Sequence, residues 1–302
     1  MRTAGLGALT KRNVKLYFKD KGMFFSSLIT PLILLVLYTT FLKNVFEDSF
    51  RGALDAAGAA VSDSIIGGCV GGQLVSSLLA VSCVTVAFCS NLLMVQDKIS
   101  GARRDLTVTP VHSGTLALSY YAASLLSTLI ISFAASAVCF AYLAAEGWYL
   151  STADIAAVIG DVILLCLFGT ALSSCVNFPL TTQGQASAVG TIVSAGYGFI
   201  CGAYMPISQF SDGLQKVLSF LPGTYGTSML RSHALRGVFE EMSNHGFPDQ
   251  VIESIRDSVD CNIYFYGDKV SIGNMYIILP ASIAILVALY VLMNVIKAKR
   301  EK

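Results

Sequence analysis

The sequence predicts an all-α polytopic membrane protein with six transmembrane helices. The chain is 54% hydrophobic and only 13% charged, whereas soluble domains are about 25% charged. Its acidic and basic residues are absent from five stretches, each long enough for the ~20 apolar residues of a crossing helix. These stretches are too long for barrel strands, so helices are the remaining way to satisfy the backbone in lipid. The charge-free stretches are Gly22–Leu42, Ser64–Gln96, Leu106–Ala145, Val162–Ser211 and Val270–Ile296.

Six spans fit these stretches if the fourth one contains two helices. Residues Asn177–Gln185 combine Asn, Pro, Thr, Gln and Gly, a composition typical of turns, which predicts a break there. The expected spans are Met23–Phe41, Ile66–Val95, Leu116–Ala144, Ile155–Val176, Ser187–Tyr204 and Ser271–Ile296.

Basic residues gather on one side of these spans. Because Lys and Arg concentrate in cytoplasmic segments, that side is expected to be cytoplasmic and to hold both termini. Thirteen of the 20 Lys and Arg lie there: Arg2, Lys11, Arg12, Lys15, Lys19, Lys21, Lys98, Arg103, Arg104, Lys297, Lys299, Arg300 and Lys302.

The first 21 residues form a segment of their own before the transmembrane domain of residues 22–302. Lys11, Lys15 and Lys19 recur every four residues, and Leu9 and Leu16 project to the other side of the same helical wheel. This pattern predicts a cytoplasmic amphipathic helix in the membrane interface. A plain positive-inside anchor fits the periodicity equally well.

The eight cysteines do not predict a disulfide framework. Seven lie in apolar stretches, where Cys acts as a small hydrophobic residue, and Cys261 alone lies in a polar segment. A Cys69–Cys261 bridge is one alternative, and the spacing favours free thiols. No Cys and His residues share metal-ligand spacing, so no metal site is expected.

Two polar stretches interrupt the spans in a distinctive way. Residues 97–110 link the second and third spans, and taken alone they are also compatible with an ordinary positive-inside loop. Residues 206–237 follow the fifth span, with helix-breaking residues at Pro206, Pro222 and Gly223. The pieces between those breaks are too short to cross a bilayer, which predicts a re-entrant helical hairpin with a protein-covered turn. A surface loop with two amphipathic helices is the alternative.

These stretches resemble the signatures of bacterial ABC exporter permeases, the membrane subunits of drug, polysaccharide and lipid exporters with the type V exporter fold. In that family an acid, a Gly, a Leu and a Pro mark a cytoplasmic coupling helix, matched here by Asp97, Gly101, Leu106 and Pro110. The family then shows two prolines around a hydrophobic stretch, followed by an aromatic residue and an Arg. The matches are Pro206, Leu214–Leu221, Pro222, Thr224, Tyr225 and Arg231. The family often carries an acid just before that Arg, whereas this chain has Ser228 nearby.

The resemblance implies roles for both stretches. Residues 97–110, with Arg103 and Arg104, would dock on an ATP-hydrolysing partner. The hairpin, with Leu221 and Gly223, would close the outer end of the transport path. The implied assembly holds two ATPase subunits and a second permease, identical or homologous, in the bacterial plasma membrane. ATP and Mg²⁺ would be bound by the partner, because the chain has no GxxxxGK[ST] phosphate loop and hence no cofactor of its own.

Small residues indicate where helices approach closely. Gly198 and Gly202 are spaced four apart in the fifth span. By the resemblance these glycines, with Tyr197, would lie at the dimer seam and substrate path. Packing within one chain is the alternative interpretation.

Asp161 is the one carboxylate inside an expected span, and such a charge indicates cation coupling or substrate recognition by default. Because it is near the outer end of its span, a hydrated carboxylate without a transport role is the alternative. Residues 238–269 predict an acidic extracellular cap with a short helix near Pro248–Ser258, serving substrate release, partner contact or neither.

The expected function is export of a hydrophobic or amphipathic small molecule or peptide, such as a drug, powered by separate ATPase subunits. No catalytic residue is expected in this chain. The alternatives are a self-contained secondary transporter or channel, and a membrane enzyme. The GxSxG and HExxH motifs of hydrolases are absent, which disfavours the enzyme.

Overall fold

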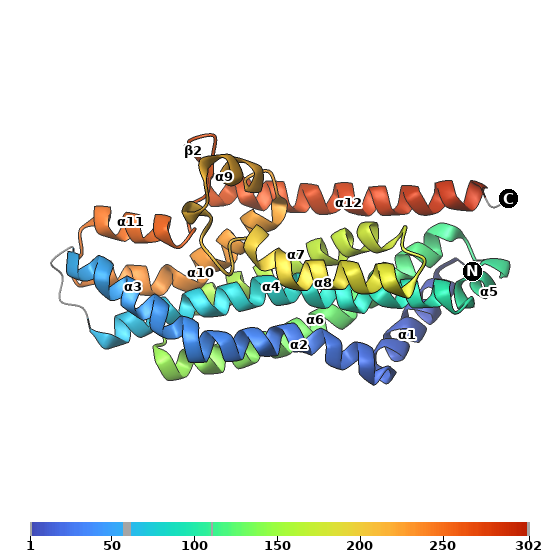
Figure 1. Ribbon diagram of the computed structural model, residues 1–302, viewed down its shortest axis with the longest axis horizontal. Coiled ribbons are helices and arrows are strands. Elements are labelled where there is room, and N and C mark those ends of the chain that lie inside the picture. Colours follow the sequence, from blue (N-terminus) through green and yellow to red (C-terminus); the bar gives the residue numbers. More distant parts are fainter. Residues whose placement is uncertain (1, 57–61, 110, 301–302) are drawn as a thin grey trace.

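A computed structural model describes residues 2–56, 62–109 and 111–300 of the chain. The protein is an elongated bundle of helices (Figure 1). Its helices are α1 (Arg2–Lys19), α2 (Lys21–Leu37), η1 (Tyr38–Leu42), α3 (Lys43–Ala56), α4 (Asp63–Ile99), α5 (Ala102–Val108), α6 (Ser113–Glu146), α7 (Thr152–Asn177), α8 (Gln183–Ile200), η2 (Ile207–Gln209), α9 (Asp212–Leu218), α10 (Pro222–Asn244), α11 (Asp249–Ser258) and α12 (Ile272–Arg300). Strands β1 (Tyr264–Phe265) and β2 (Asp268–Lys269) pair antiparallel.

Both ends of the described chain lie at one end of the bundle together with α5, and α3 and α11 lie at the other (Figure 1). We call these the α5 end and the α11 end. The common location of the two termini agrees with an even number of crossings.

Five segments among the described residues are long and apolar enough to cross a membrane. They are Lys21–Gly52, Asp63–Ile99, Ser113–Glu146, Thr152–Asn177 and Ile272–Lys297. They coincide closely with five of the six expected spans, so the expected class of helical membrane protein is confirmed. The remaining expected span corresponds to α8, whose 18 residues reach about 27 Å. The count of six therefore stays a prediction.

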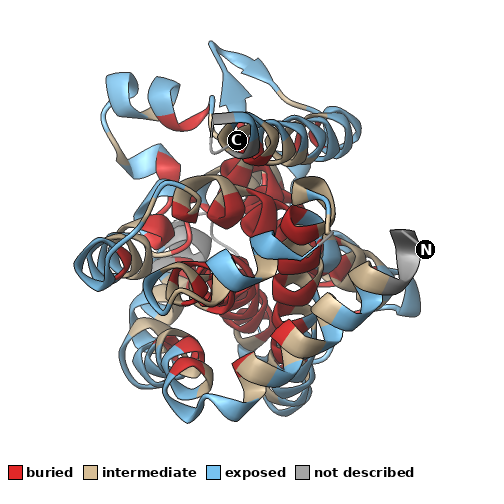
Figure 2. Ribbon diagram, turned by 90° about the vertical axis from the view of Figure 1, so that its right-hand side faces the viewer, coloured by how far each residue is buried: buried red, intermediate tan, exposed pale blue. Residues whose placement is uncertain are grey.

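Helix α4 is the central element of the bundle. It is 37 residues long and buried along nearly its whole length, and it packs against α2, α3, α6, α7, α8 and α10. Seen along the long axis, buried residues gather in the middle of the bundle and exposed ones on its rim (Figure 2). Large exposed apolar side chains on α2 and α12, among them Ile33, Val36, Ile277 and Ile285, are suited to contact with lipid.

Local sequence explains the ends of these helices. The expected break after Asn177 is confirmed, because α8 restarts at a capping box in which Thr182 and Gln185 bind each other's backbone. Helix α10 starts with Pro222 at its first turn. It does not stop where the expected hairpin ends at residue 237. It continues to Asn244, shortly before Gly246 with φ +80°, so the second arm of the hairpin and the start of the expected cap are one helix.

Candidate coupling and gating sites

The link at the α5 end begins with a sharp turn at Gly101. Helix α4 ends at Ile99, and Gly101 adopts φ +84° before α5 starts at Ala102. This left-handed backbone conformation favours glycine. The sequence motif thus marks the joint between the central helix and the short exposed helix.

Asp97 is turned into the bundle, where it joins three helices. It is 5% exposed, forms an ion pair with Arg12 of α1 at 2.7 Å, and accepts a hydrogen bond from the Tyr120 hydroxyl of α6 at 2.6 Å. The bond to Asp97 raises the pKa of the Arg12 guanidinium. Asp97 therefore connects α1, α4 and α6 within the bundle, and its role in coupling to an ATPase stays a prediction.

Two further motif residues of the link also face the bundle. Arg103 donates to Asn294 of α12 at 3.0 Å and lies over the ring of Phe178. Leu106 is half-buried and packs on the apolar cluster around Tyr290. Pro110 lies outside the described residues.

The outward face of α5 carries other side chains. Arg104 and Asp105 are exposed, and Val108 is 84% exposed. Only Arg104 of the motif residues named from the sequence projects outward from this helix. The sequence motif did not single out Asp105 and Val108, because a motif does not indicate which residues of a helix face outward.

The turn after α8 is built around two glycines. Gly202 has φ +74°, and a Cβ there would lie 2.9 Å from a carboxylate oxygen of Asp260. A Cβ on Gly198 would lie 2.3 Å from the ring of Tyr204, which folds back over α8. Both glycines thus make close contacts within their own chain, and the dimer-seam role stays a prediction.

Tyr197 connects α8 to the start of α10. Its buried hydroxyl lies 2.6 Å from where a Cβ on Gly223 would be. Nearby, Tyr225 donates a hydrogen bond to the Ser219 carbonyl, while Pro206 is buried and Leu221 half-buried. The α10 arm of the hairpin is therefore covered by protein, whereas α9 is largely exposed, as are Val217 within it and Phe220 just after it. The re-entrant hairpin thus stays a prediction.

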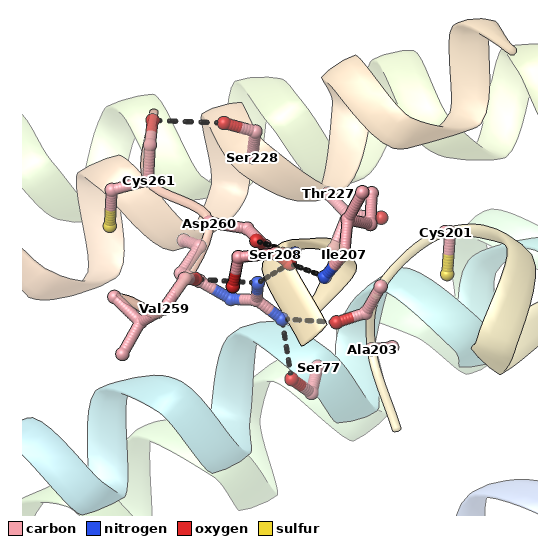
Figure 3. A network of polar contacts seen from close by, with 12 residues as sticks. Ser77, Cys201, Ala203, Ile207, Ser208, Thr227, Ser228, Val259, Asp260 and Cys261 are labelled. Atoms are coloured by element: carbon pink, nitrogen blue, oxygen red, sulfur yellow. Dashed lines mark hydrogen bonds and ion pairs between the residues drawn. The ribbon is translucent and has the colours of Figure 1, made fainter. Parts of the chain in front are cut away.

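Arg231 is the centre of the buried polar network at this hairpin, and its partners Ser77, Val259 and Asp260 are labelled in Figure 3. The side chain is fully buried. It donates to the Val259 carbonyl at 2.6 Å, to the Gly202 carbonyl at 2.9 Å and to the Ser77 hydroxyl at 3.0 Å. It thereby joins α10 to α4, to the turn after α8 and to the segment after α11.

The ionic partner of Arg231 is Asp260, at 3.4 Å. Asp260 also accepts hydrogen bonds from the backbone N–H groups of Ile207, at 2.6 Å, and Ser208, at 3.3 Å. Burial raises the pKa of Asp260, and Arg231 and these backbone donors oppose that rise. This chain has Ser228 near the place of the family's acid, and Arg231 pairs instead with an acid 29 residues further along the chain.

Asp161 is enclosed by protein at a third polar site. It is fully buried in α7, with His233 Nδ1 of α10 at 2.6 Å and the Tyr276 hydroxyl of α12 at 2.9 Å. The interpretation of Asp161 as a hydrated carboxylate is therefore wrong. Its position near a helix end predicted exposure, but α10 and α12 cover it.

The cysteines are free thiols throughout the described residues. Cys69 and Cys261 are both buried in the main apolar cluster and are not bonded to each other. Burial raises the pKa of the Cys261 thiol to about 12, which keeps it protonated and unreactive at neutral pH. No cluster of three potential metal ligands occurs among the described residues.

Comparison with known proteins agrees with this architecture. No curated protein matches the chain. The family model of the ABC-2 type transporter matches residues 4–235, a region that includes the link, the turn after α8 and Arg231. The chain is therefore a multi-pass membrane component of an ABC transporter and belongs to the ABC-2 type transporter family.

Proposed function

We propose that this chain is the permease subunit of an ATP-driven exporter that moves a hydrophobic or amphipathic small molecule or peptide out of the cell. Two separate ATPase subunits supply the energy, and a second permease, identical or homologous, completes the assembly. The α5 end faces the cytoplasm and the α11 end faces outward. The outward face of α5 is the observation that supports this proposal most directly.

That face is suited to docking on a partner. Val108 at the end of α5 is 84% exposed. It is flanked by the exposed charges of Arg104 and Asp105. A single exposed apolar residue is common on protein surfaces; what favours docking is its place on the short helix that matches the coupling motif of the family.

Motion at α5 has a direct route to the hairpin through α4. Gly101 joins α5 to α4, and Asp97 ties the same end of α4 to α1 and α6. Further along α4, Ser77 accepts a hydrogen bond from Arg231. Helix α4 is continuous over 37 residues, so it moves largely as one rigid rod. A force on α5 therefore tilts α4 and displaces Ser77 relative to Arg231.

The nature of the cargo is supported by an apolar cavity in the side of the bundle. It has a volume of about 420 Å³ and lies between α2, α4 and α6. Its lining includes Phe24, Leu28, Leu35, Leu78 and Ile131, and none of its described lining residues is charged. Such a cavity fits an apolar portion of a ligand.

Co-purification tests the proposal. The tagged chain is expressed with candidate ABC ATPases of its source cell, and the detergent extract is assayed for a bound ATPase. The Arg104→Glu/Val108→Asp variant should lose the ATPase while keeping its elution volume and melting temperature. Lys216→Glu on exposed α9, at a distance from α5, serves as the matched charge-reversal control and should retain the ATPase.

Retention of a stoichiometric ATPase by the α5 variant would contradict docking at that helix. The direction of transport is measured in inside-out vesicles, where an exporter accumulates cargo on ATP addition. Uptake by vesicles without any ATPase would instead favour a self-contained transporter, although family membership argues against one.

A further inference from the structure

A second cavity lies near the α11 end, away from the link and from the apolar cavity. Its volume is about 410 Å³. Its walls are the middle of α10, the last turn of α11, the loop after α11, β2 and the start of α12. It is therefore built largely from the part of the chain beyond the hairpin.

The lining of this cavity contains three cations, Arg236, Arg256 and Lys269, together with the imidazole of His233, and none of its described lining residues is acidic. The charged side chains that face the cavity are therefore N–H donors.

The carboxylates that pair with these groups are not part of the lining. Asp161 binds His233 and Asp154 binds Arg236, both from α7. Glu240, at 3.8 Å, is a second neighbour of Arg236.

Glu253 is the acid near the other two cations, and it is shared between them. It is bonded to Lys269, and it lies 3.9 Å from Arg256.

Arg256 retains the largest unused capacity for hydrogen bonding. Within the described part of the chain it donates no hydrogen bond at ordinary length, and its guanidinium lies over the Phe239 ring at 5.1 Å. Stacking on an aromatic ring fixes the plane of the guanidinium and leaves its N–H edge free. Lys269 uses one carboxylate oxygen as acceptor and is 45% exposed, so two of its three N–H donors remain available.

An apolar wall accompanies the charges. Phe239, Val270 and Ile272 line the same cavity, and Ile272 begins α12, one of the membrane-crossing segments. The cavity therefore opens where a long apolar helix starts, beside the level at which lipid headgroups lie.

We infer that this cavity binds a phosphate-bearing anion with an attached apolar group, held by Arg256 and Lys269 and with Arg236 beside them. A guanidinium and an ammonium that converge with free N–H groups match the oxygens of a phosphate, and Phe239 and Ile272 contact the apolar part. The source is either the headgroup of an anionic phospholipid or a soluble organic phosphate. The site does not depend on the direction of transport or on coupling to an ATPase.

Binding at this site would also contact the structural pairs of α7. Arg236 and His233 line the cavity with one side and bind Asp154 and Asp161 with the other.

The experiment uses the purified full-length chain in lipid nanodiscs, with binding followed by thermal unfolding. One arm compares nanodiscs of phosphatidylcholine alone with nanodiscs containing phosphatidylglycerol. The other arm adds glycerol 3-phosphate or inorganic phosphate to phosphatidylcholine nanodiscs. Stabilisation by phosphatidylglycerol identifies a lipid headgroup, and stabilisation by the soluble phosphates identifies a free anion.

Variants locate the effect. Arg256→Gln/Lys269→Gln should weaken binding at least about tenfold, since each lost charged hydrogen bond costs about 1.5–3 kcal/mol. Arg51→Gln/Lys216→Gln removes two cations outside the cavity and should leave affinity unchanged. Equal loss in both variants, or no stabilisation by any of the probes, would overturn the inference.

A second measurement does not need a variant. Lys269 and Lys216 are both acylated by an amine-reactive reagent in the unaltered protein, and their rates are read by mass spectrometry. Phosphatidylglycerol or glycerol 3-phosphate should slow the labelling of Lys269 and not that of Lys216. Unprotected Lys269 at saturating ligand would likewise refute the site.

Discussion

The Ser77 hydroxyl of α4 lies 3.0 Å from Nη2 of Arg231 in α10, across 154 positions of sequence. This hydrogen bond connects the central helix to the hairpin at a point that is closed to solvent. The same guanidinium is paired with Asp260, so one side chain links α4, the hairpin and the segment after α11. The first prediction follows from this arrangement.

Arg231→Met should destabilise the protein by about 3–5 kcal/mol, because it leaves the Asp260 carboxylate buried without its cation. The double variant Arg231→Met/Asp260→Asn should lose less stability than Arg231→Met alone, because neither buried charge remains. Equilibrium unfolding in mixed detergent micelles measures both. Ser77→Ala removes one hydrogen bond to Arg231 and is the milder control; it should lower the free energy of unfolding by about 1 kcal/mol. A double variant no better than the single one would show that the pair is not what the fold requires.

Tyr197 and Gly223 give the second prediction. Gly223→Ala should cost about 1–3 kcal/mol by overpacking, because the new methyl group meets the Tyr197 hydroxyl at 2.6 Å. Tyr197→Phe removes that oxygen and should restore part of the loss in the double variant. Gly160→Ala, where nothing lies within 4 Å, is the matched control and should be neutral or stabilising. The same unfolding assay applies, and the absence of rescue would count against this contact.

The third prediction concerns the attachment of α1. Asp97→Asn removes the ion pair with Arg12 and weakens the hydrogen bond from Tyr120. Amide hydrogen exchange in α1 should become faster, because α1 loses its charged contact with α4. Lys19→Gln, an exposed charge on the same helix, should leave the exchange unchanged. Equal protection in Asp97→Asn and the unaltered protein would mean that packing on α6 alone holds α1.

The fourth prediction concerns Asp161. His233→Ala leaves this buried carboxylate with Tyr276 alone and should cost about 1.5–3 kcal/mol, the value of a hydrogen bond to a charged group. Asp161→Asn/His233→Ala should be more stable than His233→Ala, because the uncompensated charge is removed. Thermal unfolding at neutral pH distinguishes the two, and the reverse order would place the role of His233 elsewhere.

Much of the fold follows from where charge is absent. The charge-free stretches predicted the crossing helices, and the turn residues after Asn177 predicted the break between α7 and α8. Helix α11 lies at Asp249–Ser258, close to the expected Pro248–Ser258. These features are local, because lipid solubility and turn formation depend on neighbouring residues.

The polar partners did not follow from the sequence. Arg231 was recognised, but its partner Asp260 was not; Asp260 follows the end of α11 and itself has φ +55°, in a turn that brings its carboxylate to Arg231. A hydrated Asp161 was one of the two alternatives from the sequence, yet His233 and Tyr276 come from two other helices to cover it. Such pairings depend on tertiary packing, which no periodicity records.

The location of Asp260 has a consequence for how this chain varies among related transporters. The carboxylate that neutralises Arg231 belongs to the segment after α11. A deletion in that segment would therefore leave a buried arginine without its counter-charge. A lineage that deletes it must at the same time replace the arginine or recruit an acid from elsewhere. Sequence drift in the loop and at position 231 should therefore be correlated, with the two changing together or not at all.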